Sequence, residues 1–208
     1  MVPPADQPDA APHRPGAGRR RGALLTSAIY RATLDELAET GFDRLSFDKI
    51  AASAGTGKAA LYRRWTTPAE LVLEALTDPL SGFGDIPVPG TGSLRGDLVF
   101  LLGGFAYIME HEPRGRALFP LITQRQRHPE LYASLRRMLL EPGQQRILDV
   151  LRAAAGRGEV DPAAVTPRIA ALGPRLVMAD LMEHGAVAPA EIEAIVDEVL
   201  IPVLARRP

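Results

Sequence analysis

Apolar residues recur at intervals of three and four along most of the chain, and no stretch alternates as a half-buried strand would. The clearest run covers residues 189–206, where the helical period is kept by Ile192, Ile195, Val196, Val199, Leu200, Val203 and Leu204. A 3.6-residue period places such side chains on one face of a helix. The sequence therefore predicts an all-α protein of about nine helices without an internal repeat.

Start and stop signals place the first helices. We predict helices at about residues 23–40, at 47–53 and at 58–64, with Gly41 ending the first and Ser46 capping the second. The run Ala54-Gly55-Thr56-Gly57 predicts a tight turn between the second helix and the third. Thr67, Pro68 and Glu70 have the spacing of a capped start, so a fourth helix begins there.

A loop rich in Pro and Gly is predicted over residues 78–92, and the rest of the chain again follows helical periods. We expect helices over 93–112, over 117–127, from Pro129 onward and over 144–155, with a break or kink at Glu141-Pro142. A helix marked by Ile169 to Leu181 has to accommodate Gly173-Pro174, and the run over 189–206 is the last.

Charge is distributed unevenly along a chain whose formal net charge is −1. Residues 14–65 hold ten basic and five acidic side chains, whereas residues 66–208 hold fourteen basic and eighteen acidic ones. A basic segment on an acidic body is typical of a polyanion-binding module joined to another domain. Chance clustering of a few arginines is the alternative.

The stretch Gly55 to Trp65, GTGKAALYRRW, has two unrelated interpretations. A phosphate-binding loop requires a glycine five residues before Gly57, a hydroxyl directly after the lysine, and a preceding buried strand. This chain has Ala52 and Ala59 at those two positions, and the preceding segment follows a helical period. The nucleotide-binding interpretation is therefore rejected.

The second interpretation is a helix that enters a groove of DNA. The first turn of such a helix has to be slim and polar because it approaches base edges, and Gly57-Lys58-Ala59-Ala60 has that character. The hydroxyl of Tyr62 can donate to a phosphate, and Arg63 and Arg64 add charge. Leu61 and Trp65 are expected to face inward. The segment therefore predicts a helix-turn-helix.

The run FDKIAASAGTGKAALYRRWTTPAELVLEAL resembles the N-terminal signature of the TetR family of transcriptional regulators, and the resemblance covers residues 24–76. It implies a homodimer in which each third helix enters the major groove of a palindromic operator, while a larger domain holds a small-molecule pocket. This chain departs from the family at Ala60, where threonine is common, and at Thr66-Thr67-Pro68, where a Ser-Lys pair is common. Both departures remove groups that could contact phosphates.

The resulting domains are a disordered tail over 1–18, a helix-turn-helix DNA-binding domain over 19–66, and a helical ligand-binding and dimerisation domain over 67–208. Lys58 is the candidate for a base edge, with a phosphate contact as the alternative. The arginines at positions 19 to 21 are expected to act as a flexible arm in the minor groove, with a solvated tail as the alternative. The expected DNA contacts are Arg19, Arg20, Arg21, Ser46, Gly57, Lys58, Ala59, Ala60, Tyr62 and Arg63.

The resemblance also implies a ligand pocket and a dimer interface, although core packing is the alternative for every residue considered. The pocket candidates are Phe105, Met109, Phe119, Ile122, Gln126, Tyr132, Leu135 and Met138. The dimer candidates lie on the last two helices, from which two subunits could form a four-helix bundle: Leu172, Leu176, Ile192, Ile195, Val196 and Val199.

Other classes of protein lack support in the sequence. There is no cysteine, the four histidines lack metal-ligand spacing, and no serine lies in a nucleophile-elbow context, so we predict no metal, no cofactor and no enzymatic activity. No signal peptide and no run of eighteen apolar residues is visible, which predicts a cytoplasmic protein without a membrane contact.

The function that the sequence favours is a ligand-responsive DNA-binding regulator, with repression and release by a small molecule as the expected mode. One alternative is a helix-turn-helix regulator that responds to a protein partner or to no ligand. The other is a helical enzyme that also carries a helix-turn-helix.

Overall fold

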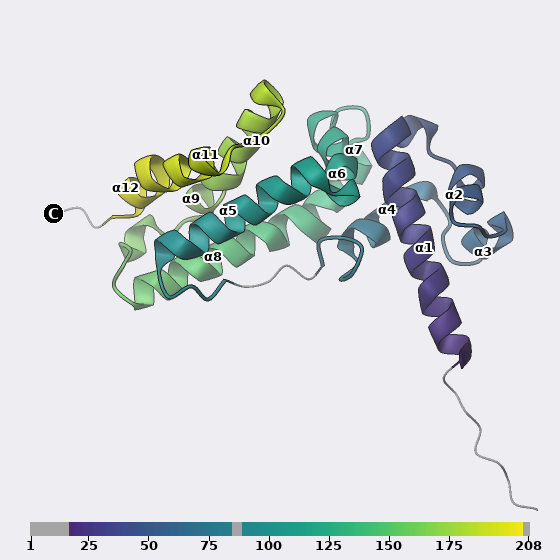
Figure 1. Ribbon diagram of the computed structural model, residues 1–208, viewed down its shortest axis with the longest axis horizontal. Coiled ribbons are helices and arrows are strands. Elements are labelled where there is room, and N and C mark those ends of the chain that lie inside the picture. The colour runs from purple at the N-terminus through teal and green to yellow at the C-terminus, as the bar shows by residue number, and fades with distance from the viewer. Residues whose placement is uncertain (1–16, 85–88, 206–208) are drawn as a thin grey trace, which may run out of the picture.

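The computed structural model describes residues 17–84 and 89–205, and within those ranges it contains helices and no β-strand. The all-α prediction is confirmed. Figure 1 shows an elongated molecule with the N-terminal helices at one end and the C-terminal helices at the other. The predicted tail lies outside the described residues, apart from Ala17 and Gly18, which begin the first helix.

In the N-terminal half, side-chain caps determine where α2 and α4 begin. Ser46 accepts the backbone N–H of Lys49 at 3.4 Å, and Thr67 and Glu70 complete the predicted capping box. The first helix begins at Ala17 rather than near residue 23, because helix-compatible residues continue beyond the apolar period. The elements are α1 (Ala17–Thr40), a 3-10 turn (Phe42–Arg44), α2 (Phe47–Ser53), α3 (Lys58–Tyr62) and α4 (Pro68–Thr77).

The C-terminal half begins after the predicted loop. Its elements are α5 (Leu94–His111), α6 (Pro113–Thr123), α7 (Pro129–Leu135), α8 (Glu141–Gly156), α9 (Pro167–Ala170), α10 (Leu172–His184), α11 (Pro189–Ala194) and α12 (Ile201–Leu204). The sixth helix starts at Pro113 rather than Ala117 and ends earlier than predicted. Proline is favourable at a first helical position, where its missing N–H would have no partner.

Two helical rods continue through prolines at which a break would be expected. A π-helical segment, Arg136–Leu140, joins α7 to α8 just before Pro142, and Ile195–Leu200 joins α11 to α12 just before Pro202. Of the expected break or kink at Glu141-Pro142, the break is wrong, because Glu141 keeps helical φ −65° and ψ −46°. The wider π turn moves the preceding carbonyls away from the proline ring, so the rod continues.

The helix that had to accommodate Gly173-Pro174 instead divides at Ala171, where α9 ends and α10 begins. Pro174 then lies in the first turn of α10, where no intrahelical N–H donor is required. If α9 and α10 count as one interrupted helix and each rod with a π segment counts as one, the described ranges contain the predicted nine helices.

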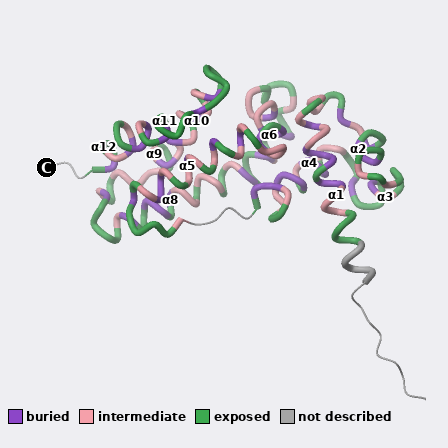
Figure 2. Tube along the Cα trace, viewed as in Figure 1, coloured by how far each residue is buried: buried purple, intermediate pink, exposed green. Residues whose placement is uncertain are grey.

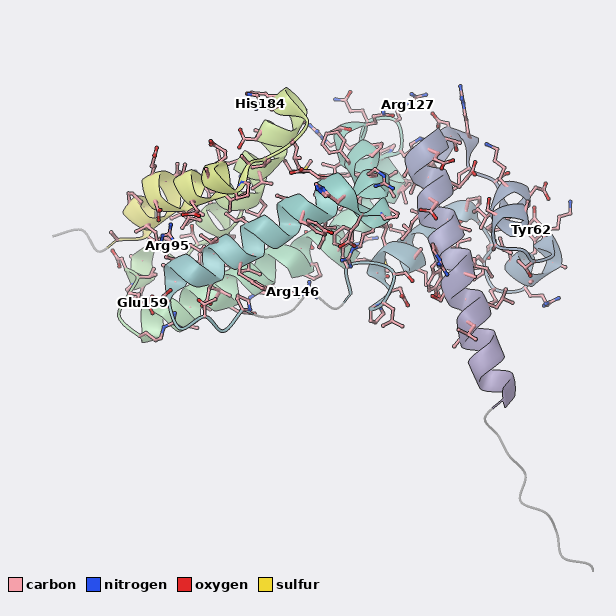
Figure 3. All side chains as sticks on the ribbon, in the orientation of Figure 1. Tyr62, Arg95, Arg127, Arg146, Glu159 and His184 are labelled. Carbon is pink, nitrogen blue, oxygen red and sulfur yellow. The ribbon has the colours of Figure 1, made fainter. Side chains whose placement is uncertain are left out.

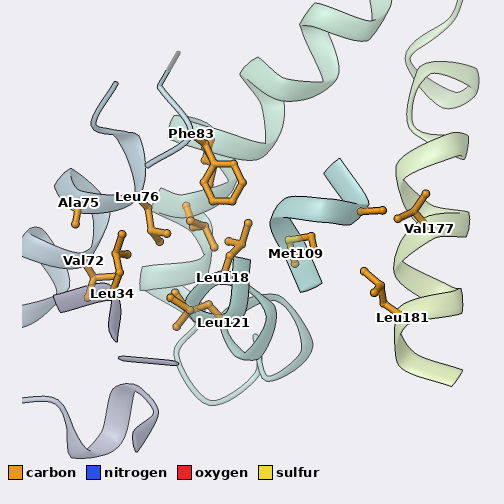
Figure 4. Packing of buried hydrophobic residues seen from close by; sticks show 14 of the residues in the cluster. Leu34, Val72, Ala75, Leu76, Phe83, Met109, Leu118, Leu121, Val177 and Leu181 are labelled. Atoms are coloured by element: carbon orange, nitrogen blue, oxygen red, sulfur yellow. The ribbon is translucent and has the colours of Figure 1, made fainter. Parts of the chain in front are cut away.

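A single cluster of buried side chains runs through both predicted domains. Figure 2 shows buried segments along the whole length of the described chain. Figure 4 shows Leu34 of α1 and Leu76 of α4 near Leu118 of α6, with Met109 of α5 and Val177 of α10 beyond them. Helix α1 packs against both α4 and α6. The two halves therefore share one core.

The far end of α5 is held by the Arg157-Gly158-Glu159 turn (Figure 3). The Glu159 carboxylate accepts the backbone N–H of Leu94 at 2.7 Å and also pairs with Arg157. These contacts, the arginine first, lower the pKa of Glu159. The turn thus places a negative charge at the N-terminus of α5, where the helix dipole favours one.

Candidate nucleic-acid interface

A tight turn fixes the angle between α2 and α3. Gly55 has φ +64°, a left-handed conformation that glycine adopts without steric cost, and the N–H of Thr56 donates to the carbonyl of Ala51 at 2.9 Å. Ile50 and Leu61 are completely buried beneath the turn. The predicted helix-turn-helix geometry is therefore present, and α3 lies on a small rigid core.

The outer face of α3 is slim where it begins. Gly57, Lys58 and Ala59 are exposed, and Ala60 is half-buried. Leu61 and Trp65 are buried, as predicted. Nothing in the described chain lies over the exposed face, and Figure 3 shows Tyr62 at the end of the molecule opposite the C-terminal helices. The arrangement leaves α3 free to enter a major groove.

Tyr62 is both packed and accessible. Its ring meets that of Phe47 edge-on with centroids 4.9 Å apart, while 61% of the residue remains exposed. The edge-on contact restricts the ring and leaves the hydroxyl in solvent. Tyr62 can therefore present its hydroxyl to a phosphate with little loss of side-chain entropy.

Lys58 carries an ion pair that the sequence did not reveal. Its ammonium lies 3.2 Å from the carboxylate of Asp48 on α2, and both side chains are more than 60% exposed. An exposed pair of this kind contributes at most about 1 kcal/mol to stability. Lys58 is therefore oriented by Asp48, but it can exchange this carboxylate for a base or phosphate acceptor.

The adjacent arginines have different surroundings. The guanidinium of Arg64 donates to the hydroxyl of Thr26 on α1 and lies 4.6 Å from the centre of the Trp65 ring. Arg63 is exposed and forms no ion pair or side-chain hydrogen bond with the described residues. The preference for Arg63 as a DNA contact stays a prediction, and the structure supplies a reason for it.

The other expected DNA contacts lie at the edges of this surface. The hydroxyl of Ser46 is used as the α2 cap, and the residue is half-buried. The backbone of Arg19 to Arg21 is helical and belongs to α1, so the expectation of a flexible arm is wrong at this point of the chain. The side chains of these three arginines lie outside the described residues, and their contact with DNA stays a prediction.

A carboxylate that the sequence did not single out joins α1 and the segment after α3 to α4. The hydroxyl of Tyr30 and the indole N–H of Trp65 both donate to Glu74 on α4. Burial, together with the hydrogen bond to Glu74, raises the pKa of Tyr30. The sequence did hold a signal that Tyr30 is buried and needs a partner for its hydroxyl. Tyr30 lies four residues before Leu34, which lies three before Leu37, so all three share the buried face of α1. Glu74 thus connects the DNA-binding helices to the helix that enters the larger half.

The predicted pocket residues are not gathered around one cavity. Met109 and Leu135 are buried in the shared core, while Gln126 and Met138 are exposed. The others are half-buried against the core: Phe105, Phe119, Ile122 and Tyr132. A cavity between α5, α8 and α10 has a volume of only about 10 Å³, the space of one water. Of the eight candidates, Tyr132 alone borders a larger cleft.

The predicted dimer residues also divide into two groups. Ile192, Ile195 and Val196 are at most 4% exposed in the single chain, so their side chains stabilise the protomer itself, and the expectation that they face a partner is corrected. Leu172, Leu176 and Val199 are half-buried. Met182 of α10 and Val203 of α12 are 63% and 45% exposed, and the sequence analysis did not select them.

The described ranges hold neither a membrane-spanning helix nor a metal-binding cluster. No helix there is long and apolar enough to cross a membrane. No group of three or more histidine, cysteine or acidic side chains gathers there in a way that could hold a metal ion.

Comparison with known proteins adds two family matches. Residues 29–75 match the family described as bacterial regulatory proteins, tetR family, and residues 88–199 match the tetracyclin repressor-like C-terminal domain. The first match contains α2, α3 and most of α4, and the second contains α5 to α11. Together the matches follow the two halves of the fold.

Relatives and a solved structure agree with these matches. The chain is 33% identical over 180 residues to an uncharacterized HTH-type transcriptional regulator of Mycobacterium tuberculosis, covering 86% of this chain and 87% of that protein. It is 32% identical over 182 residues to a DNA-binding transcriptional repressor TetR of Mycobacteroides abscessus, covering 87% and 94%. A putative TetR-family regulator of Mesorhizobium loti has the same fold, with a TM-score of 0.69 and 20% identity over 88% of this chain and 96% of that one.

The helix-turn-helix geometry, the two family matches and the relatives lead to one conclusion. The chain belongs to the TetR family and is a DNA-binding transcriptional regulator rather than an enzyme.

Proposed function

We propose that the protein is a homodimeric repressor that binds a palindromic operator and is released by a small molecule. The observation that carries the DNA-binding part is the slim, exposed start of α3 over the buried Leu61 and Trp65. A relative of the same family is named as a repressor, which supports the sign of regulation. As a regulator of transcription in a bacterium, the protein would act in the cytoplasm.

On DNA, α3 would lie in the major groove with Lys58 directed at a base edge and Gly57 close to a phosphate. A helix N-terminus favours an anion there, and Tyr62 and Arg63 would contact the flanking backbone. Two α3 helices of a dimer would lie about 34–36 Å apart, one turn of DNA. The operator half-sites should therefore be centred about one turn from each other.

The dimer would form through α10 and the α11–α12 rod. Their outer surface includes Met182 and Val203, which are exposed in the single chain, and the half-buried Leu172, Leu176 and Val199. Sedimentation velocity would test this surface: Met182→Arg should shift the protein toward monomer, whereas Met138→Arg, at an exposed methionine before α8, should leave the dimer intact.

An effector would change DNA binding through α4. That helix packs on α1 and on the segment preceding α8, and Glu74 bonds to both Tyr30 and Trp65. A molecule that binds better to a form with a different spacing of the α3 helices would draw the population away from DNA.

The decisive experiment is fluorescence anisotropy of the protein on DNA from its own upstream intergenic region, titrated with salt. Selective binding that weakens steeply with salt is expected, because phosphate contacts release counterions. A Lys58→Ala, Tyr62→Phe double variant should bind more weakly; unchanged binding would contradict the assigned interface. A thermal-shift screen of metabolites then separates an effector-responsive regulator from one that responds to a protein or to nothing.

A further inference from the structure

A cleft of about 430 Å³ opens between the two halves of the molecule. One wall is the end of α1 and the 3-10 turn, residues 37–44, and the other is the end of α6 with the connection into α7, residues 120–132. Its volume is within the range of small-molecule sites. Because each wall belongs to a different half, any occupant would contact both the DNA-binding helices and the regulatory helices.

The cleft combines an apolar floor with a charged rim. Leu37, Leu121 and Leu131 are buried along it, with Phe42 and Tyr132 half-buried beside them. The aromatic rings of Phe42 and Tyr132 keep exposed surface for an occupant, and the leucines support them from beneath. The floor therefore suits the apolar part of a small organic molecule.

At the rim, two donors converge on one carboxylate. The Asp43 carboxylate lies 2.7 Å from the guanidinium of Arg127 and 2.9 Å from Nε2 of His128, and the ring of Phe42 meets that of His128 edge-on at 4.7 Å. Arg127 is 63% exposed and Asp43 48% exposed, so the pair is open to solvent and exchangeable. Figure 3 shows Arg127 beside α1, near the junction of the halves.

We propose that this cleft binds a small organic carboxylate, whose carboxylate group replaces that of Asp43 on Arg127 and His128. The hydrocarbon part of the ligand would lie against Phe42 and Tyr132. A carboxylate satisfies both donors that Asp43 now satisfies, and arginine binds carboxylates in a two-bond geometry. A cationic ligand would instead compete with Arg127 for Asp43 and would leave the arginine without its partner.

The exchange has a direct effect on the link between the halves. Asp43 follows α1, whereas Arg127 and His128 belong to the connection between α6 and α7. Replacing Asp43 removes the ionic contact between these two segments and frees the 3-10 turn from Arg127, while the packing of α1 on α6 is kept. This inference rests on the proposed function in one respect, since it assigns the effector a place and a chemical class.

The test is isothermal titration of the full-length protein with 4-phenylbutyrate and with its uncharged amide. Arg127→Gln should weaken binding of the acid by about tenfold, since it removes a charge-assisted pair. Arg125→Gln is the matched control, because Arg125 is exposed on the same connection and does not border the cleft. Asp43→Asn should tighten binding severalfold by removing the internal competitor, and the amide should not bind.

Equal weakening by Arg125→Gln and Arg127→Gln would overturn the proposal, and so would an affinity that Asp43→Asn leaves unchanged. Absence of binding of the acid to both the wild type and Asp43→Asn would overturn it as well. Circular dichroism of each variant verifies folding, and Arg127→Lys should retain part of the affinity. DNA release is measured separately: if another molecule releases the operator equally from wild type and Arg127→Gln, the cleft assignment fails while the proposed function stands.

Discussion

The DNA-binding half (α1 to α4) and the C-terminal, regulatory half (α5 to α12) are both helical, but their candidate sites differ in how the residues are spread along the sequence. The side chains that build the helix-turn-helix lie within residues 46–65. The role of each follows from its distance in sequence to the cap of α2 or to the turn before α3. The cleft between the halves is lined by residues 37–44 and by residues from Pro120 to Tyr132, two segments that are distant in the sequence. A site within one motif can be predicted from spacing, whereas a site between elements depends on how those elements pack.

The largest expected effect tests whether the halves are one cooperative unit. Leu61→Ala in the first half and Leu102→Ala in the second should each lower the free energy of unfolding by about 2–5 kcal/mol, because both side chains are almost fully buried. Urea unfolding can be followed by the fluorescence of Trp65, the sole tryptophan, and by circular dichroism of all helices. Coincident transitions are expected from the shared core, and separate transitions would show that the halves are energetically independent.

The next effect concerns the carboxylate between α1, Trp65 and α4. Glu74→Gln should lower the free energy of unfolding by about 1–2 kcal/mol, because hydrogen bonds to a charged acceptor are replaced by weaker neutral ones. The Trp65 emission should change in the folded state. Glu198→Gln, at an exposed glutamate within the Ile195–Leu200 segment and away from the start of the rod, serves as control and should change neither quantity.

Tyr30 gives the same region a pH dependence. Its pKa is higher in the folded protein than the unfolded value of about 10, so the folded state holds the phenolic proton more tightly. The associated stability is fully present below pH 10 and is lost as the pH rises above that value. Chemical unfolding between pH 8 and 11 should show this alkaline loss in the wild type and a smaller loss in Tyr30→Phe.

The adjacent arginines sharpen the distinction between binding and stability. Arg63→Gln should weaken DNA binding by about 1 kcal/mol and reduce the salt slope by about 0.9, as expected for one lost phosphate contact. Arg64→Gln should instead lower the free energy of unfolding by about 0.5–1 kcal/mol, because Arg64 holds Thr26 and the Trp65 ring. Anisotropy and urea unfolding measure the two quantities, and equal behaviour of the variants would remove the distinction.

The smallest effect lies far from DNA. Because Arg157 and Leu94 lower the pKa of Glu159, its stabilising contribution is present above the unfolded value near 4.3 and is lost as the pH falls through the folded value. Glu159→Gln should therefore flatten the acid limb of the stability profile without changing DNA affinity. A thermal melt series from pH 3 to 7 measures this, and an unaltered acid limb would show that other carboxylates determine it.

The sequence allowed the helix-turn-helix to be predicted because its signals are local. Ser46, Thr67 and Glu70 cap the helices that they were expected to cap, and Leu61 and Trp65 face inward. The ion pair of Lys58 with Asp48 was missed because a ten-residue separation across a turn has no fixed geometry in the sequence.

In the regulatory half, the existence of the helices was predicted but their neighbours were not. An apolar stripe along a helix indicates that one face is buried, but it does not indicate which element or which subunit covers that face. Ile192, Ile195 and Val196 therefore appeared equally suited to a partner and to the protomer, and the structure places them in the protomer. The cleft could not be found, because Asp43 and Arg127 are brought together only by the packing of α1 on α6.

The two π segments have a consequence for the number of residues that the helical rods can hold. A π turn holds one more residue than the α turn that it replaces, so Arg136–Leu140 and Ile195–Leu200 each accommodate one additional residue without ending a rod. The two rods therefore hold an extra residue just before Pro142 and Pro202 and still continue past both prolines.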